Sequence, residues 1–357
     1  MRVLVAPDKF AGTLTAPEAA EAIGAGWRRR APGDEVDLVP MADGGPGFVD
    51  VLHASLGGRV VPVTVSGPYG DAVDARLLVD GDTCYVESAQ ACGLHLTRGR
   101  DPERTTTYGV GGLLLAARDA GARRVVVGLG GSGTNDGGAG LLAALGATGD
   151  RPLDAGVAGL EGITRVDLPT YDGVELVAAS DVDNPLTGLF GATKVFGGQK
   201  GIREEEMPRW DAALEAFAAA TDRFTAAGEG AGAAGGLGFA LLLLGATRRP
   251  GVEVVTEAVG LPERAAKADL VVTGEGSFDP QSSGGKAPAG VARVAGEALR
   301  PCIVLAGRVA VGVREMRALG VEAAYSLLDA VGEERAFAEP AAALAELAER
   351  VARTWSR

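Results

Sequence analysis

The sequence predicts an α/β protein in which a parallel-sheet domain is interrupted by a second, mixed α/β domain. Short Val, Leu and Ile runs alternate with Ala-rich helical stretches near both ends of the chain, a rhythm typical of β-α-β units around a buried parallel sheet. The middle of the chain changes to strands, turns and long glycine loops. At 357 residues the chain has room for two domains, since a typical domain has roughly 150 residues.

Two strand–helix units open the chain. The run VLVAPD predicts a strand followed by a helix over 16–30, and EVDLVPMADGG predicts a strand followed by a helix over 46–56. Residues 59–88 then alternate in the manner of antiparallel strands joined by turns. The change of pattern indicates that a second domain begins in this region.

The strand–helix rhythm returns in the last third of the chain. DLVVTGEG (269–276) and CIVLAGRV (302–309) predict buried strands with a helix after Lys286 between them, and a long amphipathic helix follows Pro340. One sheet built from both ends of the chain explains this return better than two domains in tandem. The expected boundaries are 1–64 with 265–357 for the discontinuous domain and 65–264 for the inserted one.

Charge argues against a polyanionic partner. Lys and Arg number 34 against 47 Asp and Glu, and the net charge of −13 repels nucleic acid and anionic membrane surfaces. The negative net charge does not exclude small anions as ligands, because local backbone N–H groups can bind phosphate in a protein of either net charge.

The cysteines and the apolar runs favour a soluble cytoplasmic protein. Cys84, Cys92 and Cys302 are odd in number and form no CxxC pair, so we expect reduced thiols and no cysteine zinc site. The apolar run at the start is too short for a signal peptide. The run at 237–246 is shorter than the ~20 residues of a spanning helix.

Polar residues and glycines follow five of the predicted strands directly. Ligands of open α/β sheets bind beyond the carboxyl ends of the strands, so these segments are the first candidates for a site. One Asp-Gly pair is an ordinary turn, but five such segments together supply oxygen ligands for Mg²⁺ and glycine loops that admit phosphate. This combination is typical of phosphoryl transfer. The residues are Asp8 and Lys9, then Asp43, then Ser132, Asn135 and Asp136, then Asp181 and Asp183, and finally Glu275 and Asp279.

Asp181 and Asp183 are the candidate metal ligands. In an extended segment, residues two apart point to the same side at ~6.5–7 Å, so one Mg²⁺ or its hydration shell can meet both carboxylates. The alternative is structural: Asp183 with Asn184-Pro185 also reads as a turn initiator.

Lysine is rare in this chain. Only five lysines stand among the 34 basic residues, and Lys9, Lys200 (in FGGQKG) and Lys286 (in QSSGGKAP) lie in loop-like polar contexts. A compact ammonium group suits a transferring phosphate as a point charge. Each of these three lysines is a candidate for contact with phosphate, with a surface role as the alternative, and Lys286 is the best of the three.

Two other segments match known nucleotide-binding motifs only in part. SSGGKA around Lys286 resembles the end of a Walker A motif, but Pro280 replaces its first Gly and Ala287 its Ser or Thr. GLGGSG (128–133) matches GxGxxG after a strand, yet no strand ending in an acidic residue follows at the distance a dinucleotide fold requires. His53 and His95 lie in apolar surroundings that favour packing.

These residues resemble a known family. Eight blocks are similar in content and order to bacterial type I glycerate kinases, and together they span essentially the whole chain. The blocks are APDKFAGTLTA (6–16), MADGGPG (41–47), TTTYGVGGL (105–113), GLGGSGTNDGGAG (128–140), SDVDNPLTG (180–188), FGGQKG (196–201), GAAGGLGFAL (232–241) and TGEGSFDPQSSGGKAPAGVA (273–292).

The resemblance implies ATP-dependent phosphorylation of D-glycerate, usually to 2-phosphoglycerate, with Mg²⁺. It also implies a discontinuous flavodoxin-like first domain and an active site in the cleft between two domains. The expected state is a monomer or a homodimer. Alternatives that remain open are a kinase that forms 3-phosphoglycerate, an NAD-dependent hydroxy-acid dehydrogenase that uses GLGGSG, and a metabolite-sensing protein without turnover.

For the kinase, we expect Asp181 or Asp183 to hold Mg²⁺ or to orient the attacking hydroxyl, with Asp43 and Asp136 as alternatives for either role. Lys286 and Lys200 would contact the β- and γ-phosphates. The remaining binding residues fall into three sets: Asp8 and Lys9 after the first strand; Gly130, Gly131, Ser132 and Asn135 as a phosphate or substrate cradle at a helix N-terminus; and Glu275 and Asp279 for the metal or the glycerate hydroxyls.

Overall fold

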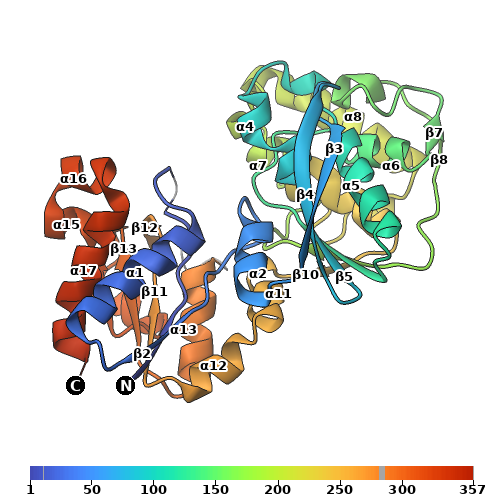
Figure 1. Cartoon of the computed structure of the whole chain (residues 1–357). Helices are drawn as coiled ribbons and strands as arrows, with labels where there is room; N and C mark the ends of the chain where they lie inside the picture. Colours follow the sequence, from blue (N-terminus) through green and yellow to red (C-terminus); the bar gives the residue numbers. More distant parts are fainter. Residues whose placement is uncertain (11, 281–285, 357) are drawn as a thin grey trace. The chain divides into compact units, whose positions relative to one another are not determined.

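The computed structural model describes residues 1–10, 12–280 and 286–356, which divide into two compact units (Figure 1). Unit 1 comprises Met1–Asp43, Asp50–Gly57 and Val252–Arg357, and unit 2 comprises Gly44–Val49 and Gly58–Gly251. Part of the predicted loop before Lys286, residues 281–285, lies outside the described residues.

Unit 1 contains a five-stranded, wholly parallel sheet. Its strands come from both ends of the chain, and their order across the sheet, numbered along the unit, is 5-4-3-1-2. This is the flavodoxin-like order, so the predicted discontinuous parallel-sheet fold is confirmed. The strands, in spatial order, are β15 (Ala323–Ser326), β13 (Cys302–Ala306), β11 (Leu270–Thr273), β1 (Arg2–Val5) and β2 (Glu35–Leu38).

Helices α1 and α17 pack on one face of this sheet. Their buried side chains form one core with alternate strand residues such as Val3, Val5 and Val272. The helices of unit 1 are α1 (Ala16–Arg30), α2 (Phe48–Leu56), α11 (Gly251–Ala258), α12 (Leu261–Lys267), α13 (Ala287–Glu297), α14 (Val313–Ala318), α15 (Leu327–Val331), α16 (Glu333–Ala338) and α17 (Pro340–Trp355).

The sequence specifies α1 at both ends. Thr15 caps it: the Glu18 N–H donates to the Thr15 hydroxyl, while the Glu18 carboxylate accepts from the Thr15 N–H at 2.8 Å. Three arginines in the last turn complement the negative end of the helix dipole. The helix covers the predicted range 16–30.

Gly26 sets how closely α1 approaches α17. A Cβ atom at this position would lie 1.9 Å from the carbonyl oxygen of Ala345, which belongs to the α17 backbone and cannot rotate away. We expect Gly26→Ala to lower the free energy of unfolding by about 2–3 kcal/mol, despite the higher helix propensity of alanine. Urea denaturation checks this, with Gly33→Ala as the matched control because a Cβ at Gly33 meets nothing within 4 Å. Equal stability of the two variants would contradict it.

Unit 2 contains a six-stranded mixed sheet. Strands β3, β4 and β5 pair antiparallel, and β5, β6, β9 and β10 continue the sheet in parallel. In spatial order the strands are β10 (Thr247–Arg249), β9 (Glu175–Ala179), β6 (Arg124–Gly128), β5 (Thr83–Glu87), β4 (Ala72–Asp80) and β3 (Arg59–Ser66).

Helices pack against this sheet and enclose the core of unit 2. They are α3 (Ala89–Cys92), α4 (Leu94–Thr97), α5 (Tyr108–Asp119), α6 (Ala139–Ala144), α7 (Ala192–Phe196), α8 (Met207–Ala220), α9 (Arg223–Ala226) and α10 (Leu237–Leu243). Two short paired strands, β7 (Thr148–Gly149) and β8 (Val166–Asp167), complete the unit.

The units divide earlier in the chain than the sequence analysis placed the domain boundaries. The expected boundary after residue 64 would cut β3, which pairs with β4 from Arg59 to Ser66 and belongs to unit 2. The expected boundary after residue 264 would cut α12, which packs on α13 and β1 in unit 1. No helix of the described ranges is long and apolar enough to pass through a membrane.

Candidate active site

Unit 1 gathers six of the predicted site residues at the carboxyl edge of its sheet. A cavity of about 570 Å³ is lined there by Asp8, Lys9, Asp43, Glu275, Asp279 and Lys286. The edge includes the point between β1 and β11 where the strand order reverses, which is where open α/β sheets bind ligands.

Backbone hydrogen bonds that continue beyond the strands hold these segments in place. The Ala6 N–H donates to Val272 O at 2.7 Å and the Asp8 N–H to Gly274 O at 2.8 Å, so the segment after β1 stays beside the segment after β11. The Met41 N–H donates to Pro7 O at 2.8 Å and ties the segment after β2 to the same row.

Asp8, Lys9 and Asp43 form a charged triad. Lys9 Nζ lies 3.5 Å from Asp8 Oδ1 and 3.7 Å from Asp43 Oδ1, and the Lys9 N–H also donates to Asp8 Oδ1 at 2.7 Å. Burial raises the pKa of Asp8 to about 6, with a further rise from Asp43 and an opposing effect of Lys9. Burial lowers the pKa of Lys9, but the carboxylates of Asp43 and Asp8 outweigh it and the pKa is raised overall. Lys9 therefore stays charged at neutral pH.

The segment after β11 supplies the rest of the charged lining. Glu275 is 6% exposed, and the Ser277 hydroxyl donates to the Asp279 carboxylate at 3.2 Å. Lys286 stands at the N-cap position of α13 and is half-buried. These residues, on one segment of chain, bring two further carboxylates and a second ammonium group to the cavity.

The sequence analysis did not foresee the apolar part of this cavity. Phe10 lies just beyond β1, whereas Leu327, Leu328, Ala336 and Phe337 come from α15 and α16. The four residues of α15 and α16 show only the ordinary hydrophobic spacing of a helix, which does not distinguish a side chain that lines a ligand site from one in the core.

A second cluster of predicted residues lies in unit 2, in the loop that follows β6. Lys200 is only 2% exposed and donates from Nζ to Ser132 Oγ at 3.0 Å and to Thr134 O at 2.7 Å. Burial lowers the pKa of Lys200 to about 8, although Cys92 and Asp136 nearby raise it. Asn135 donates to Thr193 Oγ1 at 2.9 Å. The sequence analysis placed Lys200 in a loop-like polar context, and in the structure its ammonium group is buried and braces this loop.

The expected helix N-terminus at this loop is absent from the described structure. After Gly128 the chain runs as a loop until α6 begins at Ala139, so GLGGSG does not lead directly into a helix. A Cβ at Gly130 would lie 2.5 Å from Gly45 Cα, and Gly131 has a φ of +77°. Close backbone approach and a left-handed conformation account for these two glycines.

Asp136 is enclosed within unit 2. Its Oδ2 accepts from the Thr107 N–H and hydroxyl, both at 2.8 Å, and from the Gly140 N–H at 3.1 Å, while Oδ1 accepts from the Gly138 N–H at 3.0 Å. Burial raises its pKa, and these hydrogen bonds oppose the rise. With 0% exposure, the carboxylate organises the loop instead of facing a ligand.

Asp181 and Asp183 follow β9 at its carboxyl end, as predicted. Asp181 Oδ1 accepts from the Gly251 N–H at 3.0 Å, and Asp183 forms an ion pair with Arg248 while its side chain is 73% exposed. The described residues include no group of three or more His, Cys, Asp or Glu side chains arranged to hold a metal ion.

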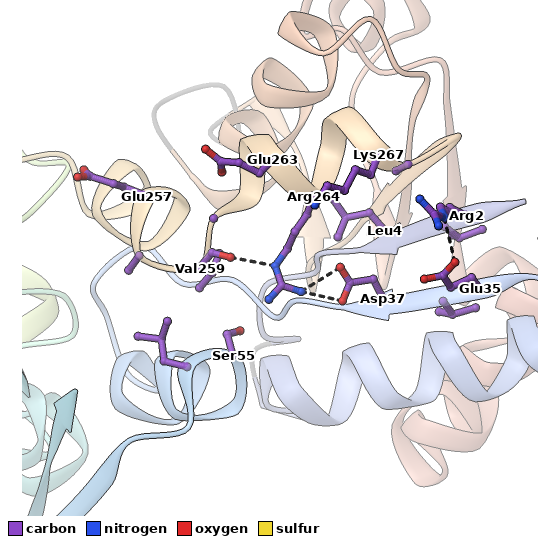
Figure 2. Close-up of a pocket in the computed structure, with 16 residues that line it drawn as sticks. Arg2, Leu4, Glu35, Asp37, Ser55, Glu257, Val259, Glu263, Arg264 and Lys267 are labelled. Carbon is purple, nitrogen blue, oxygen red and sulfur yellow. Dashed lines mark hydrogen bonds and ion pairs between the residues drawn. The ribbon is translucent and has the colours of Figure 1, made fainter. Parts of the chain in front are cut away.

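A larger cavity in unit 1, of about 1100 Å³, lies along β1 and β2 beside α12 (Figure 2). Four of its charged residues pair with one another: Arg264 Nη1 donates to both Asp37 oxygens at 2.8 and 2.9 Å, and Arg2 Nε donates to Glu35 at 2.9 Å. Arg2 and Glu35 begin their strands, so this groove extends toward the amino ends. It is a weaker candidate than the cavity at the carboxyl edge.

Comparison with known proteins decides the family. The family model described as "Glycerate kinase family" matches residues 3–356. The chain belongs to the glycerate kinase family. A glycerate kinase of Bacillus subtilis is 41% identical over 99% of this chain and 96% of its own length, and a glycerate 2-kinase of Escherichia coli is 38% identical over 93% and 92%.

A solved structure from Salmonella typhimurium LT2, provisionally described as glycerate kinase 2, has the same fold. It superposes with a TM-score of 0.83 at 38% identity and covers 99% of this chain and 98% of its own. As a member of the glycerate kinase family, the chain is a phosphotransferase.

Proposed function

We propose that this glycerate kinase transfers the terminal phosphoryl group of ATP to the 2-hydroxyl of D-glycerate. The observation that carries the proposal is the cavity of unit 1, where Lys9 and Lys286 stand among four carboxylates at the strand-order reversal. Phosphoryl transfer depends chiefly on positioning and on neutralising phosphate charge. Two ammonium groups supply both, that of Lys9 just after β1 and that of Lys286 at the N-cap of α13.

In the proposed reaction the glycerate oxygen bonds to the γ-phosphorus, the bond from that phosphorus to the bridging oxygen of ADP breaks, and the hydroxyl proton passes to the carboxylate that orients the hydroxyl. Lys9 and Lys286 hold phosphate oxygens in place. Asp8 keeps Lys9 oriented through its two contacts with that residue. Lys200 and Asn135 support the loop after β6 in this proposal. A carboxylate orients the attacking hydroxyl, and Asp43 and Asp181 are the candidates.

Magnesium fits this site as a companion of the nucleotide. Glu275 and Asp279 offer carboxylate oxygens beside Lys286, and Mg²⁺ is usually held by one or two carboxylates together with phosphate oxygens. Asp181 and Asp183 are the alternative ligands. When bound, the ion would neutralise charge on the phosphate oxygens.

Incubation with MgATP and each glycerate enantiomer, followed by phosphorus NMR of the product, tests the proposal. We expect ADP and 2-phosphoglycerate from D-glycerate. A 3-phosphoglycerate signal would select the alternative regiochemistry. Absence of ADP release with either enantiomer would overturn the kinase proposal and favour a sensing protein.

Nothing in the described structure favours the dehydrogenase reading, because the GLGGSG loop does not open a helix as a dinucleotide site requires. We also propose that the enzyme works in the cytoplasm, where ATP is abundant, and the buried free thiols of Cys84, Cys92 and Cys302 are compatible with that compartment. The monomer or homodimer expected from the resemblance stays a prediction that light scattering can check.

Substitution of the two aspartates after β9 tests their role. We expect Asp181→Asn combined with Asp183→Asn to lower kcat at least about 100-fold if they hold Mg²⁺ or orient the hydroxyl, with little change in thermal unfolding. Steady-state kinetics at saturating substrates measures this. Near-normal turnover of the double variant would remove these residues from the site. Asp167→Asn, at an exposed position in β8, is the matched control.

A further inference from the structure

The charged and the apolar side chains that line the cavity of unit 1 lie mostly at different ends, with Phe10 as an apolar residue beside the charged ones and Glu333 as a carboxylate in α16 at the apolar end. The charged residues Asp8, Lys9 and Asp43 follow β1 and β2 at one side of the sheet. The apolar side chains of Leu327 and Leu328 begin α15, directly after β15 at the opposite edge. Phe337 from α16 completes the apolar end, and its side chain is 61% exposed.

Backbone hydrogen bonds connect the segments that line the cavity from one end to the other. The Leu328 N–H donates to Gly307 O at 3.0 Å, and the Gly307 N–H donates to Glu275 O at 3.0 Å. The segments after β15, β13 and β11 are therefore tied in a row that leads to Asp8. From β15 to β1 there are three strand intervals, which at ~4.8 Å each span ~14 Å. An extended nucleoside triphosphate has a comparable length from its base to its terminal phosphate.

Glycerate does not match the apolar end of this cavity. Each of its three carbons carries oxygen, so an apolar wall would strip water from its hydroxyls without replacing the hydrogen bonds. A nucleotide has the required division, with a flat aromatic base at one end and phosphates at the other.

Building on the proposed kinase function, we propose that unit 1 binds the nucleotide, with the base in the apolar end formed by α15 and α16. Phe337 stacks on the base, and Leu327 and Leu328 pack along it. The phosphates extend past Arg308, which lines the middle of the cavity, toward Lys9 and Lys286. Phe337 is thus a nucleotide-binding residue outside the phosphate-handling cluster.

Phe337→Ala separates base binding from phosphate binding. Loss of a base-stacking ring corresponds to an increase of about tenfold in KM for ATP. The value of kcat stays within about twofold, because the base is remote from the reacting atoms and its binding is the same in ground and transition states. Phe337→Tyr, which keeps an aromatic ring, restores the KM.

Inorganic tripolyphosphate, which has no base, is the second probe. We expect its inhibition constant as a competitor of ATP to be the same in Phe337→Ala as in the wild type. In Lys9→Met we expect this constant to rise. Phe224→Ala is the matched control, since Phe224 is 89% exposed in unit 2, and it leaves KM for ATP and for glycerate unchanged.

Titration calorimetry with MgADP tests the same inference without turnover. Wild-type protein binds MgADP about tenfold more tightly than Phe337→Ala. Equal binding of MgADP by the two proteins would overturn the inference. So would a Phe337→Ala variant in which tripolyphosphate inhibits as much more weakly as ATP binds, or one in which only the KM for glycerate rises. A protein that binds MgADP in a Phe337-dependent manner but phosphorylates no glycerate would refute the proposed function and leave the nucleotide site standing.

Discussion

Asp136→Ala is expected to unfold unit 2 or lower its free energy of unfolding by at least about 4 kcal/mol. The Asp136 carboxylate accepts hydrogen bonds from three backbone N–H groups and from the Thr107 hydroxyl, all of them buried. Alanine would leave these donors without a partner, and each buried unsatisfied donor costs about 1–3 kcal/mol. The sum is a large part of the 5–15 kcal/mol that stabilises a typical domain.

Urea denaturation and near-UV circular dichroism measure this loss. Asp167→Ala is the control, because its exposed carboxylate contacts only Arg165 among the described ion pairs and should change stability by no more than ~0.5 kcal/mol. A stable Asp136→Ala protein that has lost only activity would show instead that this carboxylate serves the reaction.

Asp8→Asn is expected to stabilise the protein at neutral pH and to reduce its activity. The pKa of Asp8 is raised from 3.8 to about 6, so its ionisation opposes folding. The folded state holds this proton more tightly than the unfolded state, and the free energy of unfolding therefore falls as pH rises from about 4 to about 6. Asparagine has no such charge, and above pH 6 we expect a gain of about 1–3 kcal/mol.

Activity changes in the opposite direction. The amide loses the negative charge that Asp8 places beside Lys9 Nζ, leaving Asp43 as the described ion-pair partner of Lys9. We expect kcat/KM to fall at least about tenfold, in keeping with other residues that position a ligand-binding group. Thermal unfolding from pH 4 to 8 checks the stability, and the difference between variant and wild type should open between pH 4 and 6. A constant difference across that range would refute the assignment to Asp8.

Part of this protein could be predicted from its sequence because strand ends have a physical meaning. Asp8, Lys9, Asp43 and Glu275 follow apolar runs, and parallel strands bring such positions to one edge. The helix over 16–30 could be predicted because capping and apolar spacing agree there.

The remaining features depend on long-range packing. Asp136 and Lys200 have the same neighbours in sequence as ligand-binding residues, namely glycines and small polar side chains, yet both are buried. Phe337 shares its helical pattern with many core residues, and only the position of α16 beside the cavity distinguishes it. The limits of the two units differ from the expected domain boundaries because they depend on whether β3 and α12 pack with one unit or the other.

Unit 1 is assembled from segments at both ends of the chain, and this affects how it folds during synthesis in the cell. Strands β1 and β2 leave the ribosome first, but their neighbour β11 begins only at Leu270. At a translation rate of about 5–20 residues per second, these strands wait on the order of 10–50 s with an unprotected apolar face. Unit 2, which is almost continuous from Gly58 to Gly251, is complete in sequence before that wait is over. Truncated chains that end near residue 260 and have been released from the ribosome should therefore contain a protease-resistant unit 2 preceded by an amino-terminal segment that is still cleavable.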